Sequence, residues 1–388
     1  MISKRADRKR MSGSGVHKIV FASHSSAASG GELALARYLK SSQLMDVELV
    51  TLAPGEIWDD VEARGVSVVV PRLMRRCRSQ ILDMIAFRRY LAENRGALIV
   101  SNSMRMALLV SLFRSRHHSH VYWVRDGLVQ GSTSSFAQYL TRIFTLNRVD
   151  ACIANSDWTR GTILDLKPDM RVDVVPSPSG LVPFGQATKW RATHPVARDG
   201  APLRLLYLGR LSEWKGVHVA IEAVNKINAK AAGVVATLDI AGAAQFGENE
   251  YENRVRAAVR DTHGVRMLGH VRDPQSWITD YDGLLHCSLK PEPFGQVVVQ
   301  AMSGGLVTFA SNHGGPREVI THLKNGVLVA PGDPEALACQ VSETFGDVLT
   351  ARRISARAIV RAQDFSDDVI VRELDRVLKL RREQLLRD

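Results

Sequence analysis

The stretch Leu205–Gly216, with the sequence LLYLGRLSEWKG, contains the strand and the loop of one repeating unit of the fold. Its first apolar residues run without alternation into Gly209, as in a strand that is buried on both faces of a sheet. Arg210 and Lys215 follow the strand, and a segment with helical spacing begins after Gly216. This order predicts a strand, a basic loop and a helix, which is the repeating unit of a parallel sheet covered by helices.

Short apolar runs of this kind recur along the whole chain, with helical spacing between them. In the first half they are residues 17–23, 47–52, 66–71, 97–102, 121–125, 151–155 and 172–176. In the second half they are residues 203–208, 237–241, 265–268, 283–288, 306–310 and 326–329. We therefore predict an α/β fold with two parallel sheets in tandem. Its ligand site is expected in the cleft beyond the carboxyl ends of the strands.

The predicted division of the chain follows from a break in this pattern. Prolines and small residues interrupt the alternation, so we interpret residues 183–202 as a flexible linker. The first domain is then expected over 16–182 and the second over 203–364. Residues 1–15 are expected to be a disordered basic arm, because no apolar core of a secretory signal follows them. The amphipathic segment 365–388 is expected to form a helix that packs back on the first domain.

Composition narrows the possible classes of protein. The chain has 388 residues, of which 45% are apolar and 23% charged, as in globular proteins. No apolar run approaches the ~20 residues that span a bilayer. The cysteines Cys77, Cys152, Cys287 and Cys339 form no CxxC pair and have no metal-ligand spacing with histidine. Neither a disulfide framework nor a zinc site is expected, and the expected compartment is the cytoplasm.

Positive charge is concentrated in the first half of the chain. Residues 1–190 hold 26 Lys and Arg against 16 Asp and Glu, and the whole chain has a net charge of +11. The chain lacks a recognition-helix, RNP or zinc signature and has only 6% aromatic residues for base stacking, so no nucleic acid is expected as a partner. An anionic membrane surface, bound peripherally, is a possible partner, and a solvated basic face is the alternative. The motivating residues are 4–10, Arg72, Arg75, Arg76, Arg78, Arg88 and Arg89.

Two further motifs place polar groups next to predicted helices. KPEPFG, residues 290–295, puts Glu292 ahead of a helical run that begins at Gln296. Amides at a helix N-terminus hold phosphate or sugar oxygens, and a carboxylate accepts hydrogen bonds from sugar hydroxyls. NHGGPRE, residues 312–318, lies between a strand and a helix, and its paired glycines are expected to let the backbone approach a ligand. Alone, Glu292 also fits an ordinary charge at a helix N-terminus, and residues 312–318 fit an ordinary turn between strand and helix.

Taken together, the three motifs resemble glycosyltransferase family 4, whose members have the GT-B fold. They occur in the order and spacing of that family between residues 204 and 331, with weaker matches at Gly30, Gly31 and 154–156. The resemblance implies an α/β fold of two tandem Rossmann-like domains, with parallel sheets facing across a cleft. It also implies a retaining transferase that takes a sugar from a nucleoside diphosphate sugar.

The resemblance also assigns roles to single residues. Arg210 and Lys215, which follow Gly209, match the pair that binds the donor diphosphate, and Glu292 matches a glutamate that contacts the donor sugar. Phe294, Gly295 and Gln296 match groups that hold the sugar and the distal phosphate. Gly269, His270 and Val271 match a segment that packs on the base, and Gly30 and Gly31 match the loop that shapes the acceptor and phosphate site.

Two positions depart from the family pattern. The second glutamate of the family, which binds the ribose hydroxyls, is Gln300 here. An amide still accepts and donates hydrogen bonds, so we expect nucleotide binding weakened by ~1–2 kcal/mol rather than lost. A histidine that contacts the donor sugar is replaced by Arg125, followed by Asp126, which is a candidate catalytic residue whose role stays open. The DxD sequence 280–282 resembles a metal-binding motif, but an ordinary loop explains it better, so neither a metal nor another cofactor is expected.

The sequence therefore predicts an enzyme that transfers a sugar from a nucleotide sugar, in polysaccharide, glycolipid or related glycoconjugate biosynthesis. The acceptor is expected to be a glycan, a lipid-linked sugar or a small molecule. Arg210, Lys215 and the helix N-terminus near Gln296 are expected to stabilise the leaving diphosphate. Gln300 and Arg125 motivate one alternative, a catalytically weak binding subunit of the same fold. The other alternative is a glycosyltransferase of a small-molecule natural product.

Overall fold

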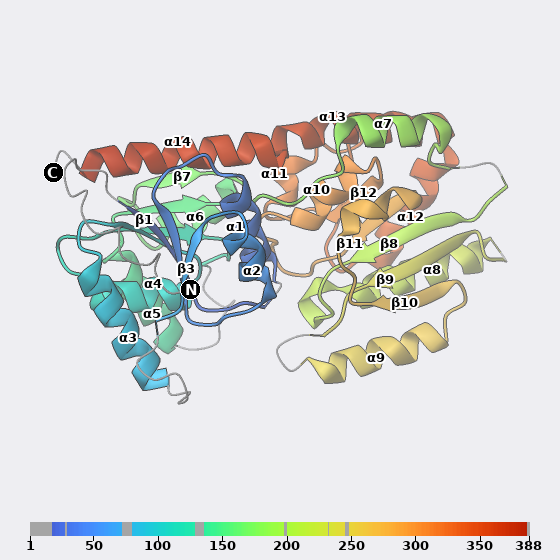
Figure 1. Cartoon of the computed structure of the whole chain (residues 1–388). Helices are drawn as coiled ribbons and strands as arrows, with labels where there is room; N and C mark the ends of the chain where they lie inside the picture. Colours follow the sequence, from blue (N-terminus) through green and yellow to red (C-terminus); the bar gives the residue numbers. More distant parts are fainter. Residues whose placement is uncertain are drawn as a thin grey trace, which may run out of the picture.

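The computed structural model contains two lobes, each built on a parallel sheet with helices around it (Figure 1). The structure describes residues 18–27, 29–71, 80–128, 136–197, 200–231, 233–244 and 248–385.

The first sheet has seven strands in the order β3-β2-β1-β4-β5-β6-β7. They are β1 (Ile19–Ser23), β2 (Val47–Thr51), β3 (Ser67–Val69), β4 (Leu98–Ser101), β5 (Ser119–Val124), β6 (Ala151–Ala154) and β7 (Val172–Val174). Its helices are α1 (Gly30–Ser41), α2 (Glu56–Glu62), α3 (Gln80–Glu93), α4 (Met104–Phe113), α5 (Phe136–Leu146) and α6 (Asp157–Leu164). The strand order reverses between β1 and β4, and a ligand crevice opens at such a point beyond the carboxyl ends of the strands.

The second sheet has six parallel strands in the order β10-β9-β8-β11-β12-β13. They are β8 (Leu203–Leu208), β9 (Ala236–Ala241), β10 (Val265–Gly269), β11 (Gly283–His286), β12 (Val307–Ser311) and β13 (Val327–Val329). Its helices are α7 (Phe184–Thr193), α8 (Val217–Lys230), α9 (Asn249–Arg260), α10 (Gln296–Ser303), α11 (Pro316–Val319), α12 (Pro334–Gly346) and α13 (Val348–Ala362). The strand order reverses between β8 and β11, so the loops that follow these two strands open on either side of one crevice.

All the apolar runs that were predicted as strands overlap observed strands, which confirms the predicted fold class. The central strands β1, β4 and β12 are buried along their whole length, as unbroken apolar runs require. The helices of the first lobe lie between its strands, as the helical spacing between the apolar runs predicted.

The connection between the two sheets differs from the flexible linker that was predicted over 183–202. Residues Phe184–Thr193 form helix α7, with Pro183 as its N-cap. The Trp190 indole donates a hydrogen bond to the Thr279 carbonyl at 2.9 Å, and Arg191 donates to the Tyr281 carbonyl at 2.6 Å. These contacts fix α7 to the second lobe, so prolines at the two ends of this segment delimit a helix rather than a flexible chain.

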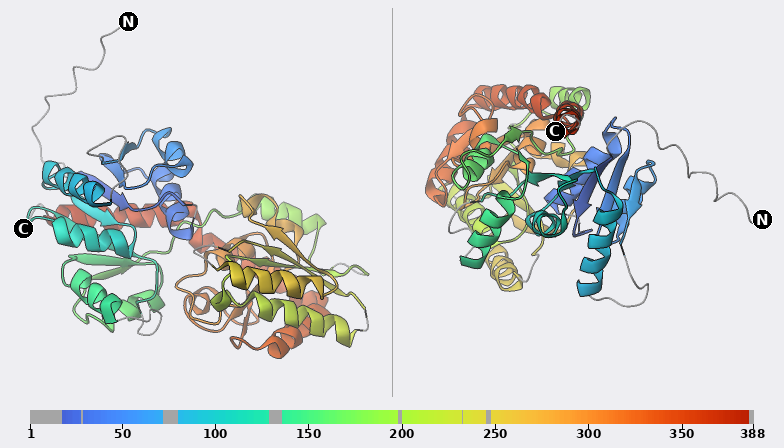
Figure 2. Two further views of the ribbon diagram at one scale, coloured as in Figure 1. Left: turned by 90° about the horizontal axis from the view of Figure 1, so that it is seen from below. Right: turned by 90° about the vertical axis from the view of Figure 1, so that its left-hand side faces the viewer.

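The last helix, α14 (Asp367–Leu385), returns to the first lobe, and Figure 2 shows it running across that lobe. Its apolar residues join the core beneath α1, together with Tyr38 and Leu39. Asp375 accepts hydrogen bonds from the Tyr38 hydroxyl (2.7 Å), the Ser42 hydroxyl (2.7 Å) and the Gln43 amide (3.0 Å). The chain therefore passes between the lobes twice, which ties their positions together.

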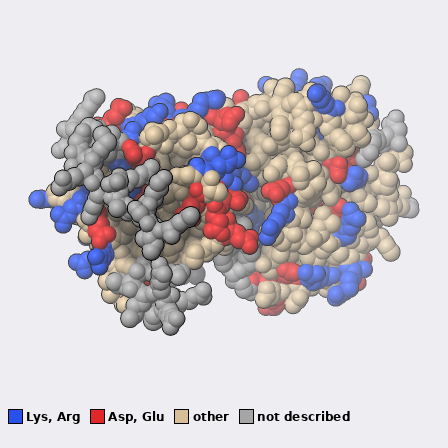
Figure 3. Space-filling view, viewed as in Figure 1, with Lys and Arg blue, Asp and Glu red and all other residues tan. Residues whose placement is uncertain are grey.

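Much of the predicted membrane-facing basic surface lies outside the described residues, including 1–15, Arg72, Arg75, Arg76 and Arg78. Arg88 and Arg89 are described and are exposed on α3. In the coloured parts of Figure 3, basic and acidic side chains are interspersed over both lobes, with an acidic group over α2. Among the helices of the described ranges, none has the length and apolar character needed to cross a membrane.

Candidate active site

A cavity of about 570 Å³ lies between the two lobes, at the carboxyl ends of both sets of strands. It is lined by most of the residues that the sequence analysis selected: Gly30, Gly31, Asp126, Gly209, Arg210, Lys215, His270, Val271, Glu292, Phe294, Gly295, Gln296 and Gln300. Gly269 is not part of the lining. Its carbonyl accepts a hydrogen bond from the Gly242 amide at 2.7 Å and so joins the ends of β9 and β10.

Gly216 places the basic loop after β8. Its φ is 66°, and a Cβ at this position would lie 2.1 Å from the Cys287 carbonyl oxygen. Only glycine fits both constraints without a shift of the backbone. The short turn Glu213–Lys215 is thereby pressed against the end of β11, and the side chain of Lys215 points toward Glu292.

The Glu292 carboxylate contacts three side chains at the cleft side of the second lobe. Lys215 donates to Glu292 Oε2, the Ser288 hydroxyl lies 3.2 Å from the same oxygen, and His286 Nε2 lies 3.5 Å from it. Burial alone would raise the pKa of Glu292, but the charge of Lys215 and the His286 contact outweigh it and hold that pKa well below its usual range. Glu292 is therefore ionised at neutral pH and acts as a hydrogen-bond acceptor.

The paired glycines at 314–315 support the Glu292 loop. A Cβ at Gly314 would lie 2.3 Å from the Glu292 carbonyl oxygen, and one at Gly315 would lie 2.5 Å from Phe294 Cα. The Gly315 amide donates to the Glu292 carbonyl at 2.8 Å. Neither glycine lines the cavity. The two glycines let one backbone segment pack directly on another, which positions the Glu292 carboxylate.

Helix α10 begins at Gln296 with its N-terminus in the cavity. Its N-cap, Gly295, has a φ of 91°, and the Val298 amide bonds back to the Gly295 carbonyl at 2.9 Å. The first amides of a helix lack intrahelical acceptors and carry partial positive charge. This end of α10 therefore offers donors to anionic oxygen atoms in the cleft.

A second helix N-terminus faces the first from the opposite lobe. Helix α1 begins at Gly30, and the Gln296 side-chain amide donates to the Gly30 carbonyl at 3.1 Å. Gly30 and Gly31 thus lie next to the start of α10. The two lobes are held close together at this point.

Arg125 lies at the first-lobe side of the cavity. Its Nη2 donates to the Asn102 carbonyl at 3.0 Å and also contacts the Asn102 side-chain oxygen, and its guanidinium lies 4.3 Å over the Trp123 ring. Its Nε and Nη1 are buried and have no hydrogen-bond partner within the described ranges. Burial lowers the pKa of Arg125 to about 10, with Glu32 opposing the shift, so the side chain stays charged at neutral pH.

Asp126 follows Arg125 and faces the open water of the cleft, although protein surrounds it on most sides. This enclosure raises the pKa of Asp126. Arg125 opposes the shift and Glu292 reinforces it. The charge of Glu292 on the opposite lobe thus adds to the effect of burial and disfavours ionisation of Asp126.

Gln300 has a structural partner that the sequence did not indicate. Its Nε2 donates to the Ser179 carbonyl, and the Ser179 amide donates to Asp367 Oδ1 at 2.8 Å. Gln300 is buried and lines the cavity. A carboxylate at this position could not make the same donation, so the amide joins α10 to the chain that connects the lobes.

Arg210 and the segment 270–271 complete the second-lobe side. Arg210 Nε lies 3.8 Å from Glu248 Oε2, and His270 is exposed beside Val271 and Pro274. Lys215 Nζ also lies 4.3 Å over the Trp214 ring. Arg210 and Lys215 therefore lie on the same side of the cavity as the N-terminus of α10.

Glu318, in the motif 312–318, and Ser156, in the segment 154–156, make contacts between the lobes, a role that the sequence analysis gave to neither side chain. Glu318 accepts from the Asp157 amide at 2.8 Å and the Trp158 amide at 2.6 Å, so a side chain of the second lobe caps helix α6 of the first. The Ser156 hydroxyl donates to the Pro293 carbonyl, next to Glu292. A serine before a short helical run is an N-cap signal, but its partner across the cleft depends on tertiary structure.

The DxD sequence lies away from the cavity. Asp282 accepts from the Ala197 amide at 3.2 Å and the Arg204 amide at 2.9 Å, and Tyr281 donates to Asp239 at 2.7 Å. The Asp282 carboxylate therefore holds the start of β8.

Comparison with known proteins gives matches over both lobes. A family model described as "Glycosyl transferase 4-like domain" matches residues 33–178, and one described as "Glycosyl transferases group 1" matches residues 189–361. The glycogen synthase of Mycobacterium tuberculosis is 32% identical over 173 residues, which are 43% of this chain and 39% of that enzyme. The putative colanic acid biosynthesis glycosyltransferase WcaL of Salmonella typhimurium is 30% identical over 207 residues, 49% of this chain and 48% of that protein.

The matched segments thus amount to less than half the length of these curated relatives. The crystal structure of Anabaena Alr3699/HepE in complex with UDP and glucose has a TM-score of 0.78 and 22% sequence identity. That likeness covers 94% of this chain and 100% of that one, and it shows the GT-B fold. The successive family matches, the shared fold and the cleft between the lobes together show that this chain belongs to the group 1, family 4-type glycosyltransferases.

Proposed function

We propose that this protein is a retaining glycosyltransferase that moves a sugar from a nucleoside diphosphate sugar to an acceptor hydroxyl in polysaccharide or glycoconjugate biosynthesis. The observation that carries the proposal is the meeting of the Lys215–Glu292 pair with the N-terminus of α10, opposite the N-terminus of α1. The name of the Salmonella relative supports a glycan product, and the UDP-glucose complex of the Anabaena protein supports a nucleotide-sugar donor.

Negative charge develops on the diphosphate as its bond to the sugar breaks. We assign Lys215, Arg210 and the first amides of α10 to stabilise that charge, in place of a divalent metal. Glu292, held ionised, accepts hydrogen bonds from the donor sugar and orients it. The arrangement is preorganised because Gly216, Gly314 and Gly315 fix the loops that carry these groups.

Retention follows if the acceptor attacks from the face that the diphosphate leaves. The acceptor oxygen then bonds to the anomeric carbon, the bond from that carbon to the phosphate oxygen breaks, and the acceptor proton passes to the diphosphate. Asp126 is assigned to orient the acceptor hydroxyl from the first lobe. The charged guanidinium of Arg125 beside it would attract an anionic or hydroxyl oxygen of the substrate.

A panel of UDP-, GDP-, ADP- and dTDP-sugars, assayed with glycan and lipid-linked acceptors, tests this proposal through release of the nucleoside diphosphate. Proton NMR of the product gives the anomeric configuration, which is expected to match the donor. Donor binding without transfer to any acceptor would instead favour the alternative of a binding subunit. A product of inverted configuration would contradict the proposed mechanism. A peripheral position at a membrane and the cytoplasmic compartment stay predictions.

A further inference from the structure

A second cavity, of about 790 Å³, lies at the other end of the first sheet. It is lined by the first residues of three neighbouring strands: Leu98 of β4, Ser119 of β5 and Ala151 of β6. The same strands end at the catalytic cleft, and β5 has six residues, so the two cavities are separated by roughly 20 Å of strand. The second cavity is therefore distinct from the donor site.

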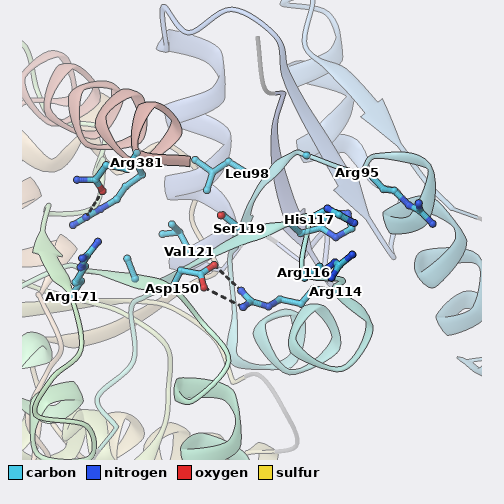
Figure 4. A pocket seen from close by; sticks show the side chains of 14 residues that line it. Arg95, Leu98, Arg114, Arg116, His117, Ser119, Val121, Asp150, Arg171 and Arg381 are labelled. Atoms are coloured by element: carbon cyan, nitrogen blue, oxygen red, sulfur yellow. Dashed lines mark hydrogen bonds and ion pairs between the residues drawn. The ribbon is translucent and has the colours of Figure 1, made fainter. Parts of the chain in front are cut away.

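Arginines from well-separated parts of the chain surround this cavity. They are Arg95, Arg114, Arg116, Arg171 and Arg381. Figure 4 shows Arg171 and Arg381 on one side and the other three, with His117, on the opposite side. Asp150 is the one acidic residue among the residues that line the cavity. With the histidines counted as neutral, the lining therefore carries a net of four positive charges.

Two of the arginines are held in place by carboxylates. Arg114 makes a two-pronged contact with Asp150, at 2.7 and 3.1 Å, and Arg381 of α14 contacts Asp173 of β7 at 2.6 Å. The bidentate pair fixes the plane of the Arg114 guanidinium. Arg381 reaches a single Asp173 oxygen with two nitrogens, and its Nη1 donates to the Gln384 side chain at 3.0 Å. The cavity is thus built partly by the helix that returns from the second lobe.

The other three arginines lack any such partner. The guanidinium groups of Arg95, Arg116 and Arg171 make no hydrogen bond or ion pair with the part of the chain that the structure describes. Like charges around one hollow repel each other, and an anion between them would relieve that repulsion. The planar fork of arginine matches the oxygen atoms of phosphate, which accept two parallel hydrogen bonds from it.

We propose that this cavity is a binding site for a phosphate group of high charge density, such as a diphosphate, separate from the catalytic cleft. The free phosphate of a soluble metabolite and the phosphate headgroup of an anionic lipid share this chemistry. In either case the bound anion would join α14 to the first residues of β4–β6. It would thereby strengthen the attachment of the helix that connects the lobes.

The test compares two double variants that remove the same charge. The pocket variant is Arg116→Ser with Arg171→Ser. The control is Arg64→Ser with Arg105→Ser, which changes exposed arginines of the same lobe outside both cavities. All four side chains are exposed, so both variants are expected to fold, and circular dichroism checks this.

Inorganic pyrophosphate is titrated calorimetrically into the full chain without nucleotide, and also in a Lys215→Ala background that weakens the catalytic cleft as a competing diphosphate site. Vesicles of phosphatidylglycerol or phosphatidylcholine are co-sedimented with the same proteins. Loss of each arginine is expected to weaken the affinity for the anion roughly tenfold. Hydrogen exchange should slow at the start of β5 and the end of α14 when the anion binds. If only pyrophosphate binding falls in the pocket variant, the source is a free phosphate. If binding to phosphatidylglycerol vesicles falls, alone or together with pyrophosphate binding, the source is a lipid headgroup.

The proposal is overturned if the pocket variant binds both probes as well as the unmodified chain does. It is also overturned if the control variant loses as much affinity as the pocket variant, because net charge alone would then explain the binding. The proposal is likewise overturned if the unmodified chain binds neither pyrophosphate nor phosphatidylglycerol vesicles. These readouts do not depend on sugar transfer, so they stand apart from the proposed function.

Discussion

Replacement of Gln300 by glutamate restores the residue type that the family pattern expects, and we predict that it destabilises this protein. The Gln300 amide donates to the Ser179 carbonyl, and both residues are buried. In Gln300→Glu an ionised carboxylate would face that carbonyl oxygen with no proton to donate. The variant therefore loses a hydrogen bond and gains a repulsive contact at the junction of α10 with the chain between the lobes.

The size of the effect follows from these two contributions. Loss of the hydrogen bond costs about 1 kcal/mol, and the unpaired buried oxygen atoms cost about 1–3 kcal/mol more. At roughly 2–4 °C per kcal/mol for a unit of this size, Tm should fall by about 4–16 °C. Gln300→Met is the matched control, because it loses the hydrogen bond at similar volume and introduces no charge.

The pH dependence gives the prediction a sign. Burial should raise the pKa of the introduced carboxyl above its ordinary value in the folded protein. Its destabilising effect is then complete above that raised pKa and disappears as pH falls toward the unfolded value, because the protonated acid can donate to Ser179. Differential scanning fluorimetry from pH 8 to pH 5 should show the gap between Gln300→Glu and the unmodified chain closing, while Gln300→Met keeps a constant gap. A Gln300→Glu variant as stable as the unmodified chain at pH 8 would refute this reasoning.

The remaining predictions concern the loops and the contact between lobes. Gly216→Ala should lower Tm by several degrees and reduce donor affinity, because its Cβ would lie 2.1 Å from the Cys287 carbonyl oxygen. Unchanged values in calorimetry and donor titration would contradict this. Glu318→Gln should weaken the cap on α6 by roughly 1 kcal/mol, since a charged acceptor becomes a neutral one. Small-angle X-ray scattering should then show a larger radius of gyration, while Tm changes little. An unchanged scattering curve would contradict the inference that Glu318 holds the two lobes together.

The sheets were predictable because their strands are buried on both faces. Unbroken apolar runs such as those around β1 and β12 leave few alternatives. Helix α7 was missed because Pro183 and Pro195 were interpreted as signs of a flexible linker, although both flank the helix and neither interrupts it. Its stability comes from contacts with residues almost 90 positions away, such as Thr279, which local patterns do not contain.

The candidate site was predictable where its residues follow strand ends. Lys215 and Glu292 come from separate strand–loop segments, and the topology of a parallel sheet brings such segments together. The Gln300 contact with Ser179 and the Glu318 cap on α6 could not be predicted, since both depend on how the lobes are placed. The arginine-lined cavity has the same origin, because its five arginines span residues 95 to 381.

The central claim is that Lys215 binds the donor diphosphate and stabilises it as it leaves. The most direct measurement is kcat for the preferred nucleotide sugar in Lys215→Ala. Lys226→Ala is the control, a lysine on α8 outside the cleft that pairs with Glu335. We predict that Lys215→Ala loses about 10²–10³ in kcat, as expected when one group that stabilises the developing charge is removed, while Lys226→Ala keeps the original rate. Near-original turnover in Lys215→Ala would contradict the account.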